Sequence, residues 1–578
     1  MRKFLLVFIF TISLNSVFSQ KGKDVIDALI EDGEGYMEDN QYEKAYFCWG
    51  KLISLDKKNE LYYKLKKGMS AIHIPAKKEE AIGLLEEVRS KDSTHYAIYF
   101  YLGEAYHHNY KFDQAITYLD KFIKEYPEAK ERKDAEMYLE QSVNGKKLTI
   151  TVVEGDIQNI GGPVNTEDAE YVPVISADET VLFYTYKGKK STGGLMDLDF
   201  KKDPDGDYYE DVFFAKKLGD AWDVPKSISD KINTKHNDAV VALSPDGQEL
   251  YTFYSNKNDG GDLYVCHLTG EEWSAPEKLG PNINTKYWEG SCSISGDGRH
   301  LYFASERPGG LGGRDIYVSE MQANGQWGPA VNLGPTINTK YNDDSPFIHP
   351  DGITLFFSSE GHNSIGGFDI MYSIKKDNSW ISPLNMGYPL NTTDDDIYYV
   401  ITAKGDKGYF SSTRTGKGEK GSHDIYKVVP GILGEKPVLA LLKGVVYGND
   451  VPMEAEFQIV KLSNNEIIGP FHSNKKSGRY LVALSPNEKY TIKVRATDKE
   501  YPAYEEPLDV AHLTKYVELV RDFHLAKGGY KDPHVDTIPT FNKLLTDTPL
   551  VKVDTPKVDT PIVDTPKVLL LVAISGMR

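Results

Sequence analysis

The sequence predicts a multidomain fold: an all-α helical repeat, then an all-β propeller, then a small β-sandwich. Three observations predict it. At 578 residues the chain is too long for a single hydrophobic core. Residues 22–145 repeat a helical pattern whose alanines are 36 and 34 residues apart. Residues 150–430 repeat a longer unit of about 53 residues that is rich in strand formers and turns.

Charge and the amino terminus exclude some classes of protein. The net charge of -18 argues against binding to nucleic acid, which needs clustered lysine and arginine. Residues 1–19 combine a basic start with a short apolar run and small residues before Gln20, which is typical of a secretory signal peptide. A buried N-terminal helix is the alternative. No cysteine follows the run, so a lipid anchor there is not expected. We therefore expect an exported chain.

Three cysteines are too few for a disulfide framework in an exported protein. We interpret Cys48, Cys266 and Cys292 as small buried hydrophobic residues. A bridge between Cys266 and Cys292 is the alternative.

Residues 22–145 repeat a two-helix unit three times. In the clearest copy, Gly103 and Ala115 are the small residues at which paired helices cross, and Pro127 ends the second helix. Earlier copies are centred on Gly33 and Gly68. This spacing resembles the tetratricopeptide-repeat family, whose concave face binds peptides or partner proteins. A packing spacer that binds nothing is the alternative.

Residues 150–430 repeat an Asn-Thr dipeptide, a strand, an Asp-Gly type turn, a second strand, a glycine-rich loop and an Asp-hydrophobic-aromatic motif. The asparagines are Asn165, Asn233, Asn284, Asn338 and Asn391. Four short strands per period indicate a propeller blade. The units resemble the WD40-like repeats of TolB-type periplasmic proteins. We predict five blades, and leave open a sixth formed by residues 147–164 with a segment after 427.

The glycine-rich stretch GGLGGRDIY, at Gly309–Tyr317, could be mistaken for a phosphate loop. A phosphate loop would occur once, between a strand and a helix, whereas this one recurs between strands. We expect its aspartate to hold the turn through backbone hydrogen bonds. Arg314 is peculiar to its blade and is a candidate for contact with a partner.

An acidic residue follows each of the five asparagines by five positions. These candidate binding residues are Glu170, Asp238, Glu289, Asp343 and Asp396. Placed just before the innermost strands, they would line one rim of the channel, where they could accept a cation or a basic segment of a partner. The interpretation we favour is that each acid caps a local turn.

No catalytic residue, metal ligand or cofactor site is predicted. The sequence lacks a nucleophile elbow, a His-Glu-x-x-His motif and a phosphate loop. Calcium is the only cofactor considered, because Asp203–Asp207 reads DPDGD, but the spacing of an EF-hand is missing. Glycan processing by acidic residues of the rim, such as Asp343 or Asp396, and a metal-binding propeller remain alternative hypotheses.

Residues 438–526 alternate strands with Asn-Asp and Asn-Asn turns, and resemble the carboxypeptidase regulatory-like β-sandwich. Residues 527–578 form a proline-rich linker and tail, because their VDTP repeats cannot bury a core.

This order of domains resembles the OmpA-family envelope proteins of Bacteroidetes, including an accessory protein of type IX secretion and gliding. The resemblance implies a periplasmic location at the outer membrane, with envelope or secretion-system proteins as partners. The family carries a C-terminal OmpA-like domain that binds peptidoglycan. The chain stops where that domain would begin, so peptidoglycan binding is not carried over. The leading hypothesis is an exported scaffold that docks proteins through several linked domains.

Overall fold

The protein is described from a computed structural model, which covers residues 23–196, 206–255, 260–414, 420–432, 434 and 436–527. The predicted signal peptide lies outside these residues, as does the predicted tail after residue 527. The described residues all belong to one compact unit. Among the described residues, no helix is both long enough and apolar enough to cross a membrane.

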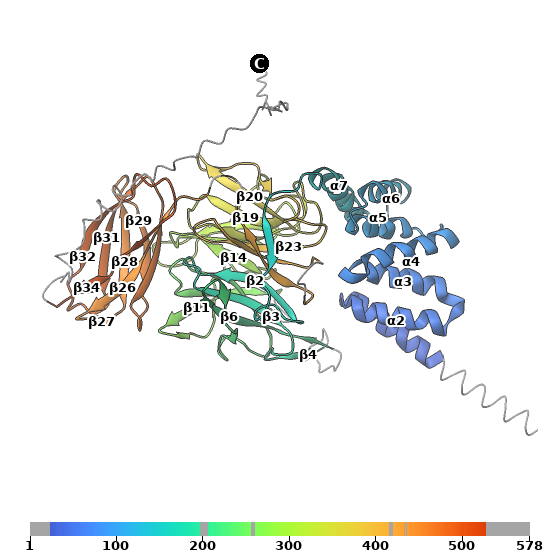
Figure 1. Cartoon of the computed structure of the whole chain (residues 1–578), viewed down its shortest axis with the longest axis horizontal. Coiled ribbons are helices and arrows are strands. Elements are labelled where there is room, and N and C mark those ends of the chain that lie inside the picture. The colour runs from blue at the N-terminus through green and yellow to red at the C-terminus, as the bar shows by residue number, and fades with distance from the viewer. Residues whose placement is uncertain are drawn as a thin grey trace, which may run out of the picture. The chain divides into compact units, whose positions relative to one another are not determined.

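The first part of the chain is all α-helical and is drawn in blue in Figure 1. A helix at residues 23–38 is followed by α2 (Tyr42–Leu55), α3 (Glu60–Ile72), α4 (Lys78–Lys91), α5 (Ile98–His108), α6 (Phe112–Glu125) and α7 (Arg132–Leu148). Consecutive helices pack against one another in pairs. This arrangement confirms the helical repeat expected for this part of the chain.

The predicted crossing glycines lie where the paired helices approach most closely. A Cβ atom on Gly103 would lie 2.5 Å from the Leu119 side chain, and one on Gly68 would lie 2.9 Å from Leu85. These distances leave no room for a side chain, because the interior is already closely packed. Helix α6 ends at Glu125, two residues before Pro127, as predicted.

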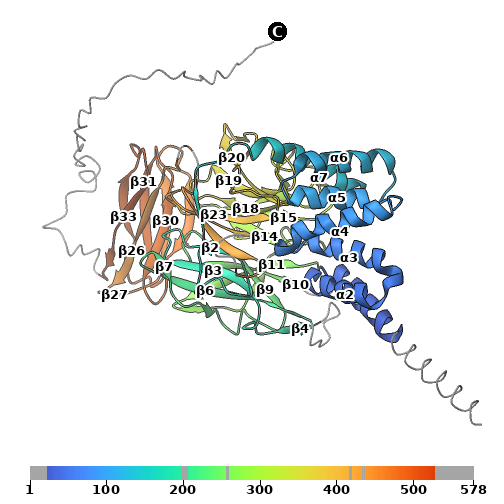
Figure 2. The same ribbon diagram turned by 45° about the vertical axis from the view of Figure 1, so that its right-hand side comes forward.

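Five antiparallel sheets follow, and each forms one blade of a propeller. The innermost strands are β2 (Ala169–Ile175), β9 (Asn237–Leu243), β14 (Ser291–Ile294), β18 (Asp343–Ile348) and β23 (Asp396–Ile401). The second strands are β3 (Val181–Lys187), β10 (Glu249–Ser255), β15 (His300–Ser305), β19 (Thr354–Ser359) and β24 (Gly408–Ser412). Neighbouring innermost strands contact one another, and Figure 2 shows β2, β14, β18 and β23 gathered at the centre.

The outer half of each blade contains its third strand and, in blades one to four, one or two short strands. The third strands are β6 (Glu210–Leu218), β11 (Asp262–Thr269), β16 (Asp315–Glu320), β20 (Asp369–Lys376) and β25 (Asp424–Val429). The short strands are β7 (Ala221–Trp222), β8 (Lys226–Ser227), β12 (Glu272–Trp273), β13 (Glu277–Lys278), β17 (Val331–Asn332), β21 (Ser379–Trp380) and β22 (Leu384–Asn385).

The ends of the propeller meet in the fifth blade. Strand β1 (Asp156–Asn159) pairs antiparallel with β25, so that Asp156 lies opposite Val429 and Asn159 opposite Tyr426. The segment at 147–164 therefore supplies the outer strand of blade five rather than starting a sixth blade. The prediction of five blades is confirmed, and the sixth blade left open by the sequence is not formed by the described residues.

An insert in blade one contains a small hairpin of β4 (Gly194–Met196) and β5 (Asp207–Tyr208). Residues 197–205 lie outside the described residues, so the calcium alternative at Asp203–Asp207 falls mostly outside them. All three cysteines are free and buried, which confirms their interpretation as small hydrophobic residues and excludes the Cys266–Cys292 bridge.

The last described part is a two-sheet β-sandwich. One sheet holds β26 (Ala440–Gly448), β27 (Val451–Pro452), β30 (Arg479–Leu484), β33 (Val517–Val520) and β34 (Phe523–Leu525). The other holds β28 (Ala455–Lys461), β29 (Ile467–His472), β31 (Lys489–Ala496) and β32 (Tyr504–Asp509). Phe457 of β28 stacks on Tyr480 of β30 with ring centroids 4.3 Å apart, so aromatic packing joins the two sheets.

Candidate functional site

The side chains of the repeated asparagines join neighbouring blades through hydrogen bonds. Asn338 donates through Nδ2 to the Ile316 carbonyl oxygen at 2.9 Å, and its Oδ1 accepts from the Ile316 amide at 2.8 Å. The same two bonds join Asn165 to Ile425, which closes the ring between blades five and one. The other pairs are Asn233 with Val212, Asn284 with Leu263, and Asn391 with Ile370. Each side chain satisfies a buried backbone amide and carbonyl of the adjacent blade.

The five predicted rim acids lie within the Asn-Thr turns. Each carboxylate accepts hydrogen bonds from the backbone amide and the hydroxyl of the threonine four residues before it. These threonines are Thr166, Thr234, Thr285, Thr339 and Thr392. All five acidic side chains are fully buried. This geometry matches the favoured interpretation of local caps, while binding of a cation or partner segment at these five acids stays a prediction.

Two of the five acids have an arginine of their own blade as counter-ion. Arg307 lies 3.4 Å from Glu289 in blade three, and Arg414 bonds Asp396 in blade five. The equivalent positions of the other three blades are Gly188, Asn256 and Gly361. Burial raises the pKa of the three acids in these blades, Glu170, Asp238 and Asp343, to about 7.

The glycine-rich loop before Asp315 is a structural turn, as predicted. The Asp315 carboxylate accepts hydrogen bonds from the amides of Leu311 at 2.6 Å and Gly312 at 2.9 Å. A Cβ atom on Gly312 would lie 1.8 Å from the Tyr341 carbonyl oxygen, so only glycine fits beside the next blade. Gly309, at the start of the loop, has a φ of 97°.

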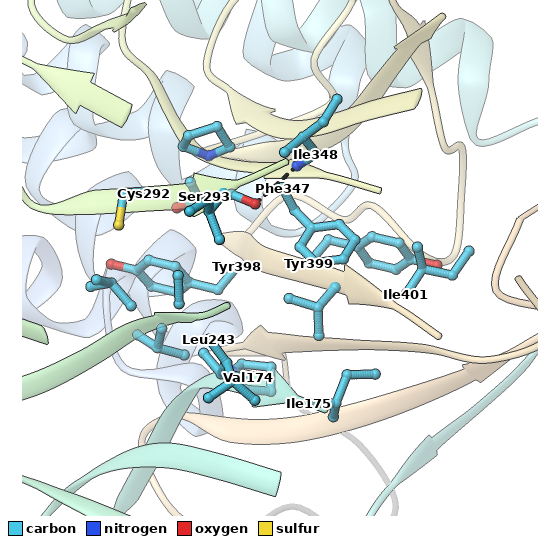
Figure 3. A pocket seen from close by; sticks show the side chains of 18 of the residues that line it. Val174, Ile175, Leu243, Cys292, Ser293, Phe347, Ile348, Tyr398, Tyr399 and Ile401 are labelled. Atoms are coloured by element: carbon cyan, nitrogen blue, oxygen red, sulfur yellow. Dashed lines mark hydrogen bonds between the residues drawn. The ribbon is translucent and has the colours of Figure 1, made fainter. Parts of the chain in front are cut away.

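The channel at the centre of the propeller is narrow and largely apolar. Its cavity has a volume of about 70 Å³ and is lined by all five innermost strands. In Figure 3, Tyr398 reaches from β23 across this channel toward Cys292 and Leu243. Pockets that enclose drug-sized ligands measure roughly 300–1,000 Å³. The channel is therefore too small to enclose a ligand of that size.

Four charged residues from four blades influence the pKa of Tyr398, whose side chain lines the channel. They are Asp344, Glu210, Arg314 and Asp395. Burial raises the pKa of Tyr398, and the charges of Asp344 and Glu210 raise it further. We call these five residues the mouth cluster.

The structure places the predicted contact residue Arg314 in this cluster. Its Nη1 donates to Asp344 Oδ2 at 2.9 Å, and its Nε donates to Glu306 Oε1 at 3.2 Å. Its guanidinium lies 4.1 Å from the centre of the Trp288 ring, a cation–π contact. About a third of the side chain remains exposed, and its contact with a partner stays a prediction.

Asp344 was not predicted as a rim residue from the sequence, and Ser345 was not predicted as a functional residue. Asp344 is buried and accepts a 2.5 Å hydrogen bond from the Ser291 hydroxyl. The Ser345 hydroxyl is also buried, lines the channel, and has no hydrogen-bond partner among the described residues. One signal was present: blade four alone has a second acid directly after the first, where the other blades have Tyr171, Ala239, Gly290 or Ile397.

Across the mouth, blade one contributes a second charged pair. The Tyr171 hydroxyl donates to Glu210 Oε1 at 2.6 Å. Glu210 is the first residue of β6 and comes directly before the motif aspartate Asp211, as Arg314 does in blade three. The position before the motif aspartate therefore carries side chains of opposite charge in blades one and three.

A comparison with protein-family models agrees with the helical repeat. A family model described as tetratricopeptide repeat matches residues 97–129. No curated protein matches the chain. The chain thus has an all-α tetratricopeptide repeat region followed by antiparallel sheets that resemble propeller folds.

Several solved structures are similar to parts of the chain. TolB from Acinetobacter baumannii is 15% identical, with a TM-score of 0.27 over 46% of this chain and 56% of its own. The chain therefore spans little more than half the length of that TolB. The Arabidopsis OM64 TPR domain is 18% identical, with a TM-score of 0.19 over 20% of this chain and 96% of its own. An alpha-L-arabinofuranosidase from Lactobacillus brevis is 13% identical, with a TM-score of 0.31 over 47% and 92%.

Proposed function

We propose that the chain is an exported scaffold of the cell envelope that binds partner proteins through its helical repeats and its propeller. It would act at the outer membrane, in the assembly of a secretion or gliding machinery of the type IX kind. Linked domains that each bind weakly raise the effective concentration of their partners, so the whole chain would bind more tightly than any one domain. The proposal assigns no reaction to the chain.

The observation that carries the proposal is a face formed by the helix at residues 23–38 and by α3, which are the first helices of two repeats. Tyr62 and Lys66 of α3 both bond Glu34 of the preceding first helix, at 2.6 and 2.7 Å. These bonds hold the two helices side by side, while Tyr62 stays 43% exposed. An exposed aromatic beside charged groups is the kind of anchor that protein interfaces use.

A capture experiment tests the proposal. The intact chain, a face variant Tyr62→Ala/Lys66→Ala and a matched control Phe47→Ala/Lys51→Ala would be used to capture proteins from envelope extracts. The control removes a more exposed aromatic–lysine pair from the second helix of the first repeat. We expect at least one protein to be recovered by the intact and control chains and to fall fivefold or more with the face variant. Equal recovery by all three chains, or no recovery, would contradict the proposal.

The glycan alternative gains no support from the geometry of the propeller. The rim acids that it would use, Asp343 and Asp396, are buried and hydrogen-bonded within their own blades. A glycosidase needs two carboxyl groups facing a space that holds a sugar ring. Turnover on a panel of glycans that is lost in Asp343→Asn or Asp396→Asn would revive that alternative.

A further inference from the structure

We propose that the mouth cluster of the propeller channel binds a single basic side chain, a lysine ammonium or arginine guanidinium, presented by a partner protein. The site is separate from the repeat face and does not depend on it. It also differs from the five rim acids predicted from the sequence, because the carboxylates concerned are their neighbours.

The charge balance at the mouth favours a cation. Tyr171 of blade one and Asp344 of blade four each directly follow a rim acid and so occupy equivalent positions at the start of their innermost strands, and Glu210 bonds Tyr171. Asp395 directly precedes the rim acid of blade five. Arg314 is the cation of the mouth cluster, and its guanidinium already bonds Asp344. An excess of negative charge therefore remains where solvent is partly excluded, and charge attraction is strong in such places.

Polar groups at the mouth that have few or no hydrogen-bond partners also favour a cationic ligand. The Ser345 hydroxyl is about 95% buried, lines the channel directly after Asp344, and has no hydrogen-bond partner among the described residues. Glu210 receives one hydrogen bond, on Oε1, from Tyr171. An ammonium group has three donors and could satisfy such acceptors together. The rings of Tyr171 and Tyr398 would flank it as cation–π partners.

The size of the cavity limits the ligand to the end of one side chain. About 70 Å³ does not admit a ligand that needs several hundred cubic ångströms. A bare metal ion is disfavoured as well, because the described residues hold no group of three or more His, Cys, Asp or Glu side chains arranged for a metal. A basic side chain carries its charge on a narrow apolar stem, which suits an apolar channel with an acidic mouth.

Calorimetric titration of the full chain with a hexalysine peptide in 150 mM salt tests the proposal. The mouth variant Glu210→Gln/Asp395→Asn removes two charges at the site. The matched control Asp220→Asn/Glu272→Gln removes two exposed charges from short outer hairpins of blades one and two. We expect the mouth variant to bind at least tenfold more weakly and the control to stay within twofold. Equal weakening of both, or no weakening, would overturn the proposal.

A second variant tests the sign of the effect. Arg314→Gln removes the cation that competes for Asp344, so hexalysine should bind at least threefold more tightly. Circular dichroism melting of each variant shows whether it is folded. If the mouth variant does not fold, the Arg314→Gln result decides alone, and weaker or unchanged binding would overturn the proposal. Because the repeat-face variant does not touch these residues, failure here leaves the capture experiment unaffected.

Discussion

Asn338 and Ile316 are joined across two blades by a pair of hydrogen bonds of 2.9 and 2.8 Å, as if the carboxamide were a strand residue. Asn338 is almost fully buried. Replacing it with alanine leaves one buried amide and one buried carbonyl without a hydrogen-bond partner. This should lower the free energy of unfolding by about 2–4 kcal/mol. Urea denaturation of Asn338→Ala should show it. The control Asn324→Ala, in an exposed turn, should change stability by less than about 0.5 kcal/mol.

Buried acids that have no arginine as counter-ion should make the propeller less stable as the pH rises. The folded-state pKa of Asp238 and Asp343 is about 7, above the ordinary value of about 4 for aspartate. The folded chain therefore holds these protons more tightly, so their stabilising effect is complete below pH 4 and disappears as pH rises through about 7. We expect the Tm to fall between pH 5 and pH 8, and Asp238→Asn/Asp343→Asn to halve that fall or more.

The control for this pH effect is an acid that has an arginine. Glu289→Gln leaves Arg307 unpaired, so the Tm should drop at every pH measured. An unchanged pH profile in Asp238→Asn/Asp343→Asn would show that these carboxyls do not titrate in this range.

The glycine-rich loop should tolerate no side chain at its closest approach. Gly312→Ala would place a methyl group 1.8 Å from the Tyr341 carbonyl oxygen, and overpacking of this kind costs roughly 1–3 kcal/mol. Gly280→Ala is the control, because nothing lies within 4 Å of its added Cβ. Thermal melting should separate the two, and an equal Tm for both would contradict the described contact.

Export predicts a defined start of the mature chain. If residues 1–19 are a cleaved signal peptide, the protein purified from the cell envelope should begin at Gln20. Intact mass spectrometry of that protein measures this directly. A chain that keeps Met1 and stays in the cytoplasmic fraction would contradict the proposed location.

Much of the architecture could be predicted because each repeat contains its own signals. The tetratricopeptide glycines and the Asn-Thr, Asp-Gly and Asp-hydrophobic-aromatic motifs act within one unit or between neighbours, so their spacing is visible in the chain. The turn-holding role of Asp315 followed from its recurrence between strands. The hydrogen-bond partners of the repeated asparagines could not be predicted from the sequence, because a carboxamide can bond any nearby backbone group.

The mouth cluster could not be predicted, for a physical reason. Glu210, Arg314 and Asp344 belong to three different repeats, and blade one, which holds Glu210, is joined to the last blade only when the ring closes. That closure depends on β1 pairing with β25, at opposite ends of the propeller sequence. The five regularly spaced acids were conspicuous, yet regular spacing reflects the shared turn, whereas Arg314 and Asp344 depart from the repeat.

The central claim, that the repeat face binds a partner protein, is tested most directly by photo-crosslinking in living cells. A photoreactive phenylalanine would replace Tyr62 on the face in one strain and Phe47, which is also exposed, in another. The account predicts a covalent adduct of defined mass from position 62 that is absent from position 47. No adduct at position 62, or the same adducts at both positions, would contradict it.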